Sequence, residues 1–217
     1  MQAIFFDLDG TLTDPKVGIT RSIQFALEHL GREVGDAEQL TWCIGPPLLD
    51  SFATILGDQN LAEKAVYVYR QRFAKTGLYE NYLYPGIAHT LSRLVGAGHR
   101  LFVATSKPTV YAKRIVEHFA IGGYFERVFG SDLNGDYANK TDLLGYALRQ
   151  TGIDPSQTIM VGDRSHDMIG ARENGMIAIG VLYGYGDQEE LLNAGAHCLS
   201  STPEGVIDVI SSLPLFD

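Results

Sequence analysis

The sequence predicts an α/β protein whose core is a doubly wound, mostly parallel sheet interrupted by an inserted α-helical domain. Three observations lead to this fold class. An apolar run at residues 4–6 ends in two aspartates and a glycine, as a buried strand followed by a turn does. Residues 15–83 then show helical spacing of apolar residues. From Pro85 onward, short apolar strands alternate with helical patterns.

The inserted domain is predicted from a succession of helical patterns. Pro15 opens the first helix, because proline is accepted in the first turn, and Gly31 ends it. The predicted helices of this segment are residues 15–31, 37–43, 48–56 and 61–74. We therefore expect a helical cap domain at residues 15–83 and a core domain made of residues 1–14 and 84–217.

In the second part of the chain, glycines and prolines separate strands from helices. The predicted strands are residues 100–105, 127–130, 158–161, 177–181 and 197–199. The predicted helices are residues 86–95, 108–119, 140–150, 165–174, 189–194 and 203–213. Strands that are separated by helices imply right-handed crossovers and parallel pairing, so we expect a Rossmann-like core.

The composition is that of an ordinary globular protein and restricts its partners. Of 217 residues, 45% are hydrophobic and 20% are charged, which is enough apolar material for a real core. Lys and Arg number 17 and Asp and Glu number 26, so the net charge is 17 − 26 = −9. This balance argues against a nucleic-acid or anionic-membrane partner. A small anionic substrate remains compatible, since a metal and a few local cations can reverse the potential inside one pocket.

Cysteine spacing and hydropathy suggest a compartment. Cys43 and Cys198 lie far apart without metal-ligand spacing and are expected to be buried thiols. No apolar run approaches the ~18 residues that a bilayer span needs. No basic region or long apolar stretch precedes the first strand. We expect a cytoplasmic, reduced protein, and its oligomeric state is not readable from these residues.

Asp7 and Asp9 follow the first strand at its carboxyl end. Alternate side chains of a strand share a face, so both carboxylates can point toward one site. In open α/β sheets, ligands gather beyond the carboxyl ends of the strands. Two acids at a strand end are also common turn formers. The interpretation of Asp7 and Asp9 as site residues therefore depends on further motifs later in the chain.

Three later pieces stand at strand ends or helix starts. Thr105 ends the apolar strand in LFVATS, where its hydroxyl and the next N–H are hydrogen-bond donors at the strand end. Lys140 begins a helix, where its cation can neutralise nearby negative charge. In VGDRSHD, Asp163 follows a buried strand and Asp167 lies one turn further on, a pattern that suits a hard cation. His166 is interpreted as structural or supporting, because magnesium disfavours imidazole.

Together with DLDGTLTD, this order of motifs resembles the haloacid dehalogenase superfamily over nearly the whole chain, helical cap included. The resemblance implies that Asp7 attacks phosphorus and forms an aspartyl-phosphate. Asp9 would protonate the leaving oxygen and then deprotonate the hydrolytic water. The implied cofactor is Mg²⁺, held by the carboxylates of Asp7 and Asp163 and the main-chain oxygen of Asp9. Asp167 would orient a metal-bound water or Lys140.

The same resemblance assigns the remaining site residues. The implied catalytic residues are Asp7, Asp9, Thr105 and Lys140. The implied phosphate contacts are Gly10, Thr11, Ser106 and Lys140. Ser106 departs from relatives similar to phosphoglycolate phosphatase, which often carry Asn there.

The expected activity is magnesium-dependent hydrolysis of a small phosphorylated metabolite, phosphoglycolate phosphatase-like or 5'-nucleotidase-like. Asp9 argues against dehalogenases and phosphonatases, which lack the second aspartate, and Leu8 against P-type ATPases, which carry Lys there. Sugar-phosphate mutases of the β-phosphoglucomutase type have Thr and His where Pro15 and Ile19 stand. Such a mutase is therefore disfavoured but remains an alternative. A non-catalytic binding protein on the same fold is the other.

The cap does not decide the substrate. Its cations can bind a substrate carboxylate and its aromatic residues can stack on a base, but charges also mark solvated helix faces and aromatics fill cores. The candidates are Arg21, Arg70, Arg72, Lys75, Trp42, Phe52 and Tyr67. The substrate, and the cap residues that select it, therefore stay open.

Overall fold

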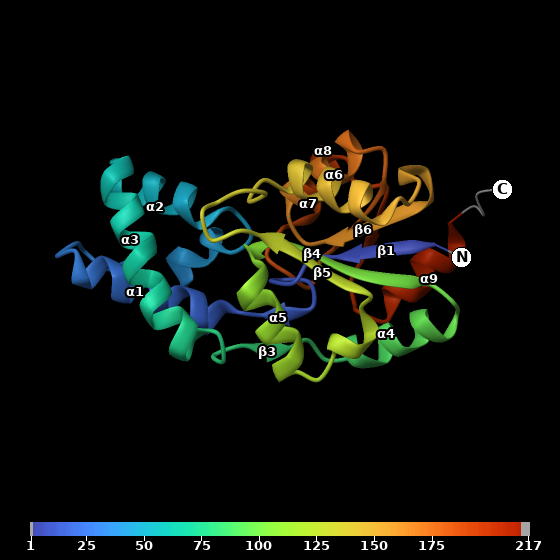
Figure 1. Cartoon of the computed structure of the whole chain (residues 1–217), viewed down its shortest axis with the longest axis horizontal. Coiled ribbons are helices and arrows are strands. Elements are labelled where there is room, and N and C mark those ends of the chain that lie inside the picture. Colours follow the sequence, from blue (N-terminus) through green and yellow to red (C-terminus); the bar gives the residue numbers. More distant parts are fainter. Residues whose placement is uncertain (1, 214–217) are drawn as a thin grey trace. The chain divides into compact units, whose positions relative to one another are not determined.

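The computed structural model describes residues 2–213 and divides the chain into two compact units. One unit is Asp14–Tyr82, and the other consists of the described residues before and after that segment. Two short strands, β2 (Thr13–Asp14) and β3 (Tyr82–Leu83), pair with each other, and the division passes through both of them. Figure 1 traces the chain through its elements.

The larger unit is built on a six-stranded parallel sheet in the order β5-β4-β1-β6-β7-β8. Its strands are β1 (Ala3–Phe6), β4 (Arg100–Pro108), β5 (Arg127–Ser131), β6 (Thr158–Gly162), β7 (Ile177–Val181) and β8 (Cys198–Ser200). The chain first builds outward from β1 to β5, then returns to the other side of β1 and continues to β8. The strand order reverses beside β1, which makes this the switch point. The prediction of a Rossmann-like, mostly parallel core is confirmed.

Helices cover both faces of this sheet, as Figure 1 shows. One face carries α6 (Lys140–Thr151), α7 (Ser165–Glu173) and α8 (Gln188–Ala194). The other carries α4 (Ile87–Gly96), α5 (Thr109–His118) and α9 (Gly205–Ser212). Strands β1, β6 and β7 are mostly apolar and buried, as strands of a parallel sheet covered on both faces are. Near the centre, Phe5 stacks on Phe102 with ring centroids 4.7 Å apart.

The smaller unit is helical. It contains α1 (Lys16–His29), a 3-10 helix (Glu38–Cys43), α2 (Leu48–Leu56) and α3 (Gln59–Arg72), which a π-helical turn (Phe73–Gly77) continues. Its core includes buried aromatic rings from two helices. Phe52 meets Tyr69 edge-on at 6.2 Å between centroids, and Tyr69 stacks on Phe73 at 5.2 Å. Aromatic pairs at these separations add to the apolar burial of this unit.

The structure differs from the predicted elements at a few places. The expected helix at residues 37–43 is a 3-10 helix. The helix expected at 61–74 begins at Gln59, because the Asp58 side chain accepts a hydrogen bond from Leu61 N and caps it. The strand expected at 100–105 continues to Pro108 through an irregular pairing with β5. β2 and β3 were not predicted, since two-residue strands show no periodicity.

Two further predictions concern the cysteines and membranes. Cys43 and Cys198 are free thiols; Cys43 is buried, whereas Cys198 is only partly so. Burial raises the pKa of the Cys43 thiol to about 11. Within residues 2–213, no helix has the length and apolar character that a membrane span requires.

Glu80 links the end of the helical unit to its first helix. Its carboxylate accepts hydrogen bonds from Arg72 at 2.7 and 3.0 Å and from Arg21 at 3.0 Å, and its carbonyl accepts from Gly18 N. The Arg72 and Glu80 side chains are each only 19% exposed. The hydrogen bonds from Arg72 lower the pKa of Glu80 below its usual range. Two of the cap cations considered as carboxylate ligands are therefore paired within the unit.

We predict that Glu80→Gln lowers the free energy of unfolding by about 1–2 kcal/mol at pH 7, because a neutral amide does not balance two guanidinium groups. Folding lowers the pKa of Glu80, so its contribution is present above the unfolded value near 4.5 and is lost as the pH falls through the folded value. Urea unfolding of both proteins should therefore show a difference that shrinks in acid.

The matched control for this prediction is Glu126→Gln. Glu126 pairs with Arg100 on the surface, where the two side chains are 45% and 39% exposed. Exposed pairs contribute little, so a change below about 0.5 kcal/mol is expected. Equal effects of the two variants at pH 7 would contradict the role given to Glu80.

Candidate active site

The residues singled out in the sequence lie at the carboxyl ends of three neighbouring strands. Asp7 and Asp9 follow β1, Thr105 lies in β4, and Asp163 follows β6. The three strands are aligned in register, and Asp7 N extends the pairing by donating to Val161 O at 2.9 Å. The switch point of the sheet thus gathers side chains from distant parts of the chain.

Lys140 is the cation at the centre of this site. Its Nζ lies 3.0 Å from Asp7 Oδ1 and 2.7 Å from Asp167 Oδ1, and it donates a hydrogen bond to Ala104 O at 2.9 Å. All three charged side chains are buried. Burial lowers the pKa of Lys140, but the charges of Asp167 and Asp7 raise it more, so the net shift is upward. Lys140 therefore stays an ammonium group between two carboxylates.

Asp163 is fully buried and is oriented by two donors. Its Oδ1 accepts from the Thr11 hydroxyl at 3.1 Å and its Oδ2 from Tyr185 N at 2.8 Å. Burial, followed by the charges of Asp167 and Asp7, raises the pKa of Asp163 well above its usual range. The Thr11 hydroxyl, an expected phosphate contact, is thus engaged with Asp163.

The loop after β7 packs tightly against Asp163 and was not singled out in the sequence. Gly186 N donates to Asp163 O at 3.0 Å, and the Tyr183 hydroxyl donates to Thr11 O at 3.1 Å. A Cβ at Gly184 would lie 2.3 Å from both Asp163 Cβ and Gly10 O. The only signal in the sequence was the pair of glycines two residues apart in YGYG, just past a predicted strand.

Asp9 has a cationic partner that was also missed. Lys107 Nζ lies 2.5 Å from Asp9 Oδ2, and the two side chains are 7% and 11% exposed. Burial raises the pKa of Asp9, while Lys107 acts against that shift. The available signal was the lysine in ATSKP, two residues after Thr105.

The other predicted residues occupy different settings. Thr105 is buried and its hydroxyl accepts from Lys107 N at 3.3 Å, whereas Ser106 is partly buried and its carbonyl accepts from Ser131 Oγ at 2.8 Å. Asp167 also accepts from Arg164 N at 3.2 Å. His166 is exposed on α7, next to the buried Asp167.

The carboxylates fit a divalent cation. Oxygens of Asp7, Asp163 and Asp167 all lie within 4.8 Å of one another and are buried. Oδ1 of Asp7 and Oδ1 of Asp167 meet Lys140 as ion pairs, but neither accepts a well-formed hydrogen bond from the described residues. The site contains four aspartates, because Asp9 lies beside these three, and two lysines, Lys107 and Lys140. When all four carboxylates are ionised, the net charge of the site is 2 − 4 = −2. Hard oxygen donors with this excess charge suit Mg²⁺.

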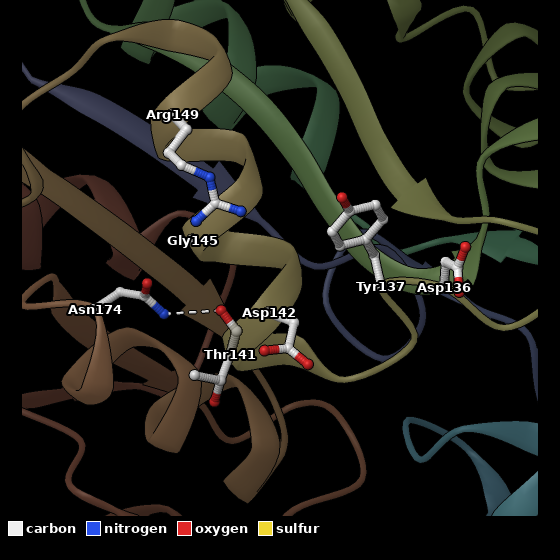
Figure 2. Close-up of a pocket in the computed structure, with 7 residues that line it drawn as sticks. All are labelled: Asp136, Tyr137, Thr141, Asp142, Gly145, Arg149 and Asn174. Carbon is white, nitrogen blue, oxygen red and sulfur yellow. Dashed lines mark hydrogen bonds between the residues drawn. The ribbon is translucent and has the colours of Figure 1, made fainter.

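A separate groove of about 470 Å³ lies along α6 and the segment before it (Figure 2). Its lining residues are Asp136, Tyr137, Thr141, Asp142, Gly145, Arg149 and Asn174. Asn174 Nδ2 donates to Thr141 O at 3.0 Å at its edge. Although Thr141 follows Lys140, none of the lining residues belongs to the aspartate cluster, so we do not assign the chemistry to this groove.

Fold and site together define a class of α/β proteins in which aspartates gather at the switch point of a parallel sheet. The family described as haloacid dehalogenase-like hydrolase matches residues 4–181. The chain belongs to the haloacid dehalogenase-like hydrolases.

Relatives and solved structures show what this chain is similar to. A 5'-nucleotidase of Pseudomonas aeruginosa is 50% identical over 87% of this chain and 86% of that protein. The tyrosine-protein kinase PtkA of Mycobacterium tuberculosis is 41% identical over 85% of this chain and 63% of that protein. A phosphoglycolate phosphatase of Vibrio parahaemolyticus is 28% identical over 98% of this chain and 94% of that protein. A crystal structure described as a predicted phosphatase from Clostridium acetobutylicum matches with a TM-score of 0.95 and 42% identity. The match covers 98% of this chain and 99% of that chain.

We predict that Gly184→Ala destabilises the protein by about 1–3 kcal/mol, because the new methyl group has to displace Asp163 or the backbone at Gly10. Thermal unfolding measures the change. Gly96→Ala is the matched control, since a Cβ there meets nothing within 4 Å. A Gly184→Ala protein as stable as the control would show that the loop does not pack as described.

Proposed function

We propose that this chain is a magnesium-dependent phosphomonoester hydrolase that acts through an aspartyl-phosphate on Asp7. The observation that carries the proposal is the contrast between two aspartates on one strand end. Asp7 lies 3.0 Å from the ammonium group of Lys140, whereas burial raises the pKa of Asp9 despite its partner Lys107. Two carboxylates in different environments suit two roles, a nucleophile and a proton donor.

In the first half-reaction, an Asp7 oxygen attacks phosphorus while the bond from phosphorus to the ester oxygen breaks. Asp9 gives its proton to the leaving oxygen, so the alcohol departs neutral and Asp9 remains as a carboxylate. In the second half-reaction, Asp9 takes a proton from water, which attacks phosphorus. Asp7 is released as a carboxylate together with inorganic phosphate. Lys140 holds Asp7 and offsets negative charge through both steps.

The proposed Mg²⁺ ligands are the carboxylates of Asp7 and Asp163 and the main-chain oxygen of Asp9. Asp167 would support the site through Lys140, which it contacts at 2.7 Å. A bound Mg²⁺ supplies positive charge that lessens the repulsion between a carboxylate and a phosphate. Thr105, with the N–H of Ser106, is proposed to donate to the phosphoryl oxygens, and Gly10 to leave room beside them.

The substrate class we favour is a nucleoside 5'-monophosphate. It rests on the similarity to the Pseudomonas aeruginosa 5'-nucleotidase, which is 50% identical over most of both chains. Phosphoglycolate is the second candidate, supported by a relative of that name that is 28% identical over 98% of this chain. A cytoplasmic location stays a prediction, which cell fractionation can check.

We predict that wild-type protein with Mg²⁺ releases phosphate from one member of a panel of nucleoside 5'-monophosphates, phosphoglycolate and sugar phosphates. Asp7→Asn should lower kcat/KM by more than about 10³-fold, since it removes the nucleophile. Asp9→Asn should lower it by about 10²–10⁴-fold with alkyl phosphates. The exposed Asp208→Asn on α9 is the control and should match wild type. An active Asp7→Asn protein, or transfer of phosphate from ATP to protein tyrosine, would refute the proposal.

We also predict that Mg²⁺ stabilises the protein through Asp163. At a concentration 100 times its Kd, a ligand adds about 2.7 kcal/mol, which corresponds to a rise in Tm of roughly 5–10 °C for a chain of this size. Asp163→Asn should lose most of this rise, and Asp208→Asn should keep it. Removing Mg²⁺ with a chelator should abolish phosphate release. A full rise in Tm with Asp163→Asn would place the cation elsewhere.

A further inference from the structure

The inference concerns Lys107, which reaches the site through an irregularity in β4. From Phe102 to Thr105 the strand pairs residue by residue with β5, up to Gly130. The next residue of β5, Ser131, is opposite Pro108. Ser106 and Lys107 are therefore extra residues in a bulge. A bulge bends a strand and turns a side chain away from the direction that regular alternation would give it.

The backbone of this bulge is fixed on both sides. A Cβ at Gly130 would lie 2.5 Å from Lys107 O and 2.8 Å from Thr109 N, so the absence of a side chain there permits the close approach. The Ser131 hydroxyl donates to Ser106 O at 2.8 Å, and the Thr109 hydroxyl donates to Ser131 O at 3.2 Å. These contacts hold the position from which the Lys107 side chain extends.

The Lys107 side chain ends on the carboxylate of Asp9. The contact from Nζ to Oδ2 is 2.5 Å, and both side chains are nearly buried. The other oxygen, Asp9 Oδ1, is buried and accepts no hydrogen bond from the residues that the structure describes. One oxygen of Asp9 is thus paired with a cation, whereas the hydrogen-bonding capacity of the second is not used by the described residues.

We propose that Lys107 is the positioning residue for Asp9: it fixes Oδ2 so that Oδ1 is the oxygen that exchanges the proton with the substrate's leaving group. This inference rests on the proposed phosphatase function and specifies which oxygen of Asp9 transfers the proton. When the bond from phosphorus to the ester oxygen breaks, the proton on Oδ1 moves to that oxygen and Asp9 becomes a carboxylate beside the Lys107 ammonium. In the second half-reaction, Oδ1 takes a proton from water.

The test compares two leaving groups. p-Nitrophenolate leaves without a proton, whereas an alkoxide requires one, so a misaligned proton donor affects alkyl phosphates selectively. Lys107→Met should lower kcat/KM about 10²-fold with the alkyl phosphate that the panel turns over fastest. With p-nitrophenyl phosphate the loss should stay below about 5-fold. Measuring kcat/KM restricts the comparison to the first half-reaction, and the exposed Lys113→Met on α5 serves as control.

A double-mutant cycle then separates positioning from direct substrate contact. If Lys107 acts through Asp9, adding Lys107→Met to Asp9→Asn causes no further loss with the alkyl phosphate. Losses that multiply, or an equal loss with both substrates accompanied by a higher KM, would instead make Lys107 a phosphate ligand and overturn the proposal. Lys107→Gln, which keeps a hydrogen-bond donor, replaces Lys107→Met if that variant does not fold and should show the same selectivity to a smaller degree.

The outcome for the inference is separable from that for the proposed function. Wild-type protein that releases no phosphate from p-nitrophenyl phosphate or any panel member would refute both. In a second outcome, Asp7→Asn abolishes the activity of the wild-type protein, but the Lys107 variants lose activity equally with alkyl phosphates and with p-nitrophenyl phosphate. That outcome would support the phosphatase function and refute only the role of Lys107.

Discussion

The constraint on which this structure depends is the concentration of negative charge at the switch point of the sheet. Asp7, Asp163 and Asp167 place oxygens within 4.8 Å of one another, away from water. Buried charges are costly unless they are paired, and Lys140 pairs with two of the three. The remaining carboxylate, Asp163, accepts two hydrogen bonds but forms no ion pair with a cation of the described residues. Burial, followed by the negative charges of Asp167 and Asp7, raises its pKa. The fold therefore holds a site that is prepared for added positive charge.

The backbone around the cluster is arranged to make this crowding possible. Gly10 has a φ of +82°, and a Cβ there would lie 2.1 Å from Asp163 Oδ2. Gly184 approaches the same aspartate from the loop after β7. Main-chain and hydroxyl donors can therefore reach the Asp163 carboxylate from two separate segments. The glycines matter for the distance they allow between the backbone and a charged group, which is a property that larger residues lack.

The sequence predicted the elements that local patterns specify. Apolar runs marked the strands, helical spacing marked the helices, and the order of motifs pointed to Asp7, Asp163 and Lys140. It did not reveal Lys107, because a bulge changes the direction of a side chain without altering composition or periodicity. It also missed Tyr183, whose hydroxyl meets Thr11 O from 172 residues away. Such contacts depend on how distant segments are brought together, which no local pattern records.

The pairing of β2 with β3 has a consequence for how the chain accommodates its inserted unit. Asp14 and Tyr82 stand at the two ends of that unit and belong to strands that pair with each other. The entropic cost of closing a loop rises only slowly with the length of the loop. The pairing of β2 with β3 closes this loop at its two ends. For the sheet, a long insertion with joined ends is equivalent to a short connection between β1 and α4. A change in the length of the helical unit between these joined ends therefore does not alter the strand order that assembles the aspartates.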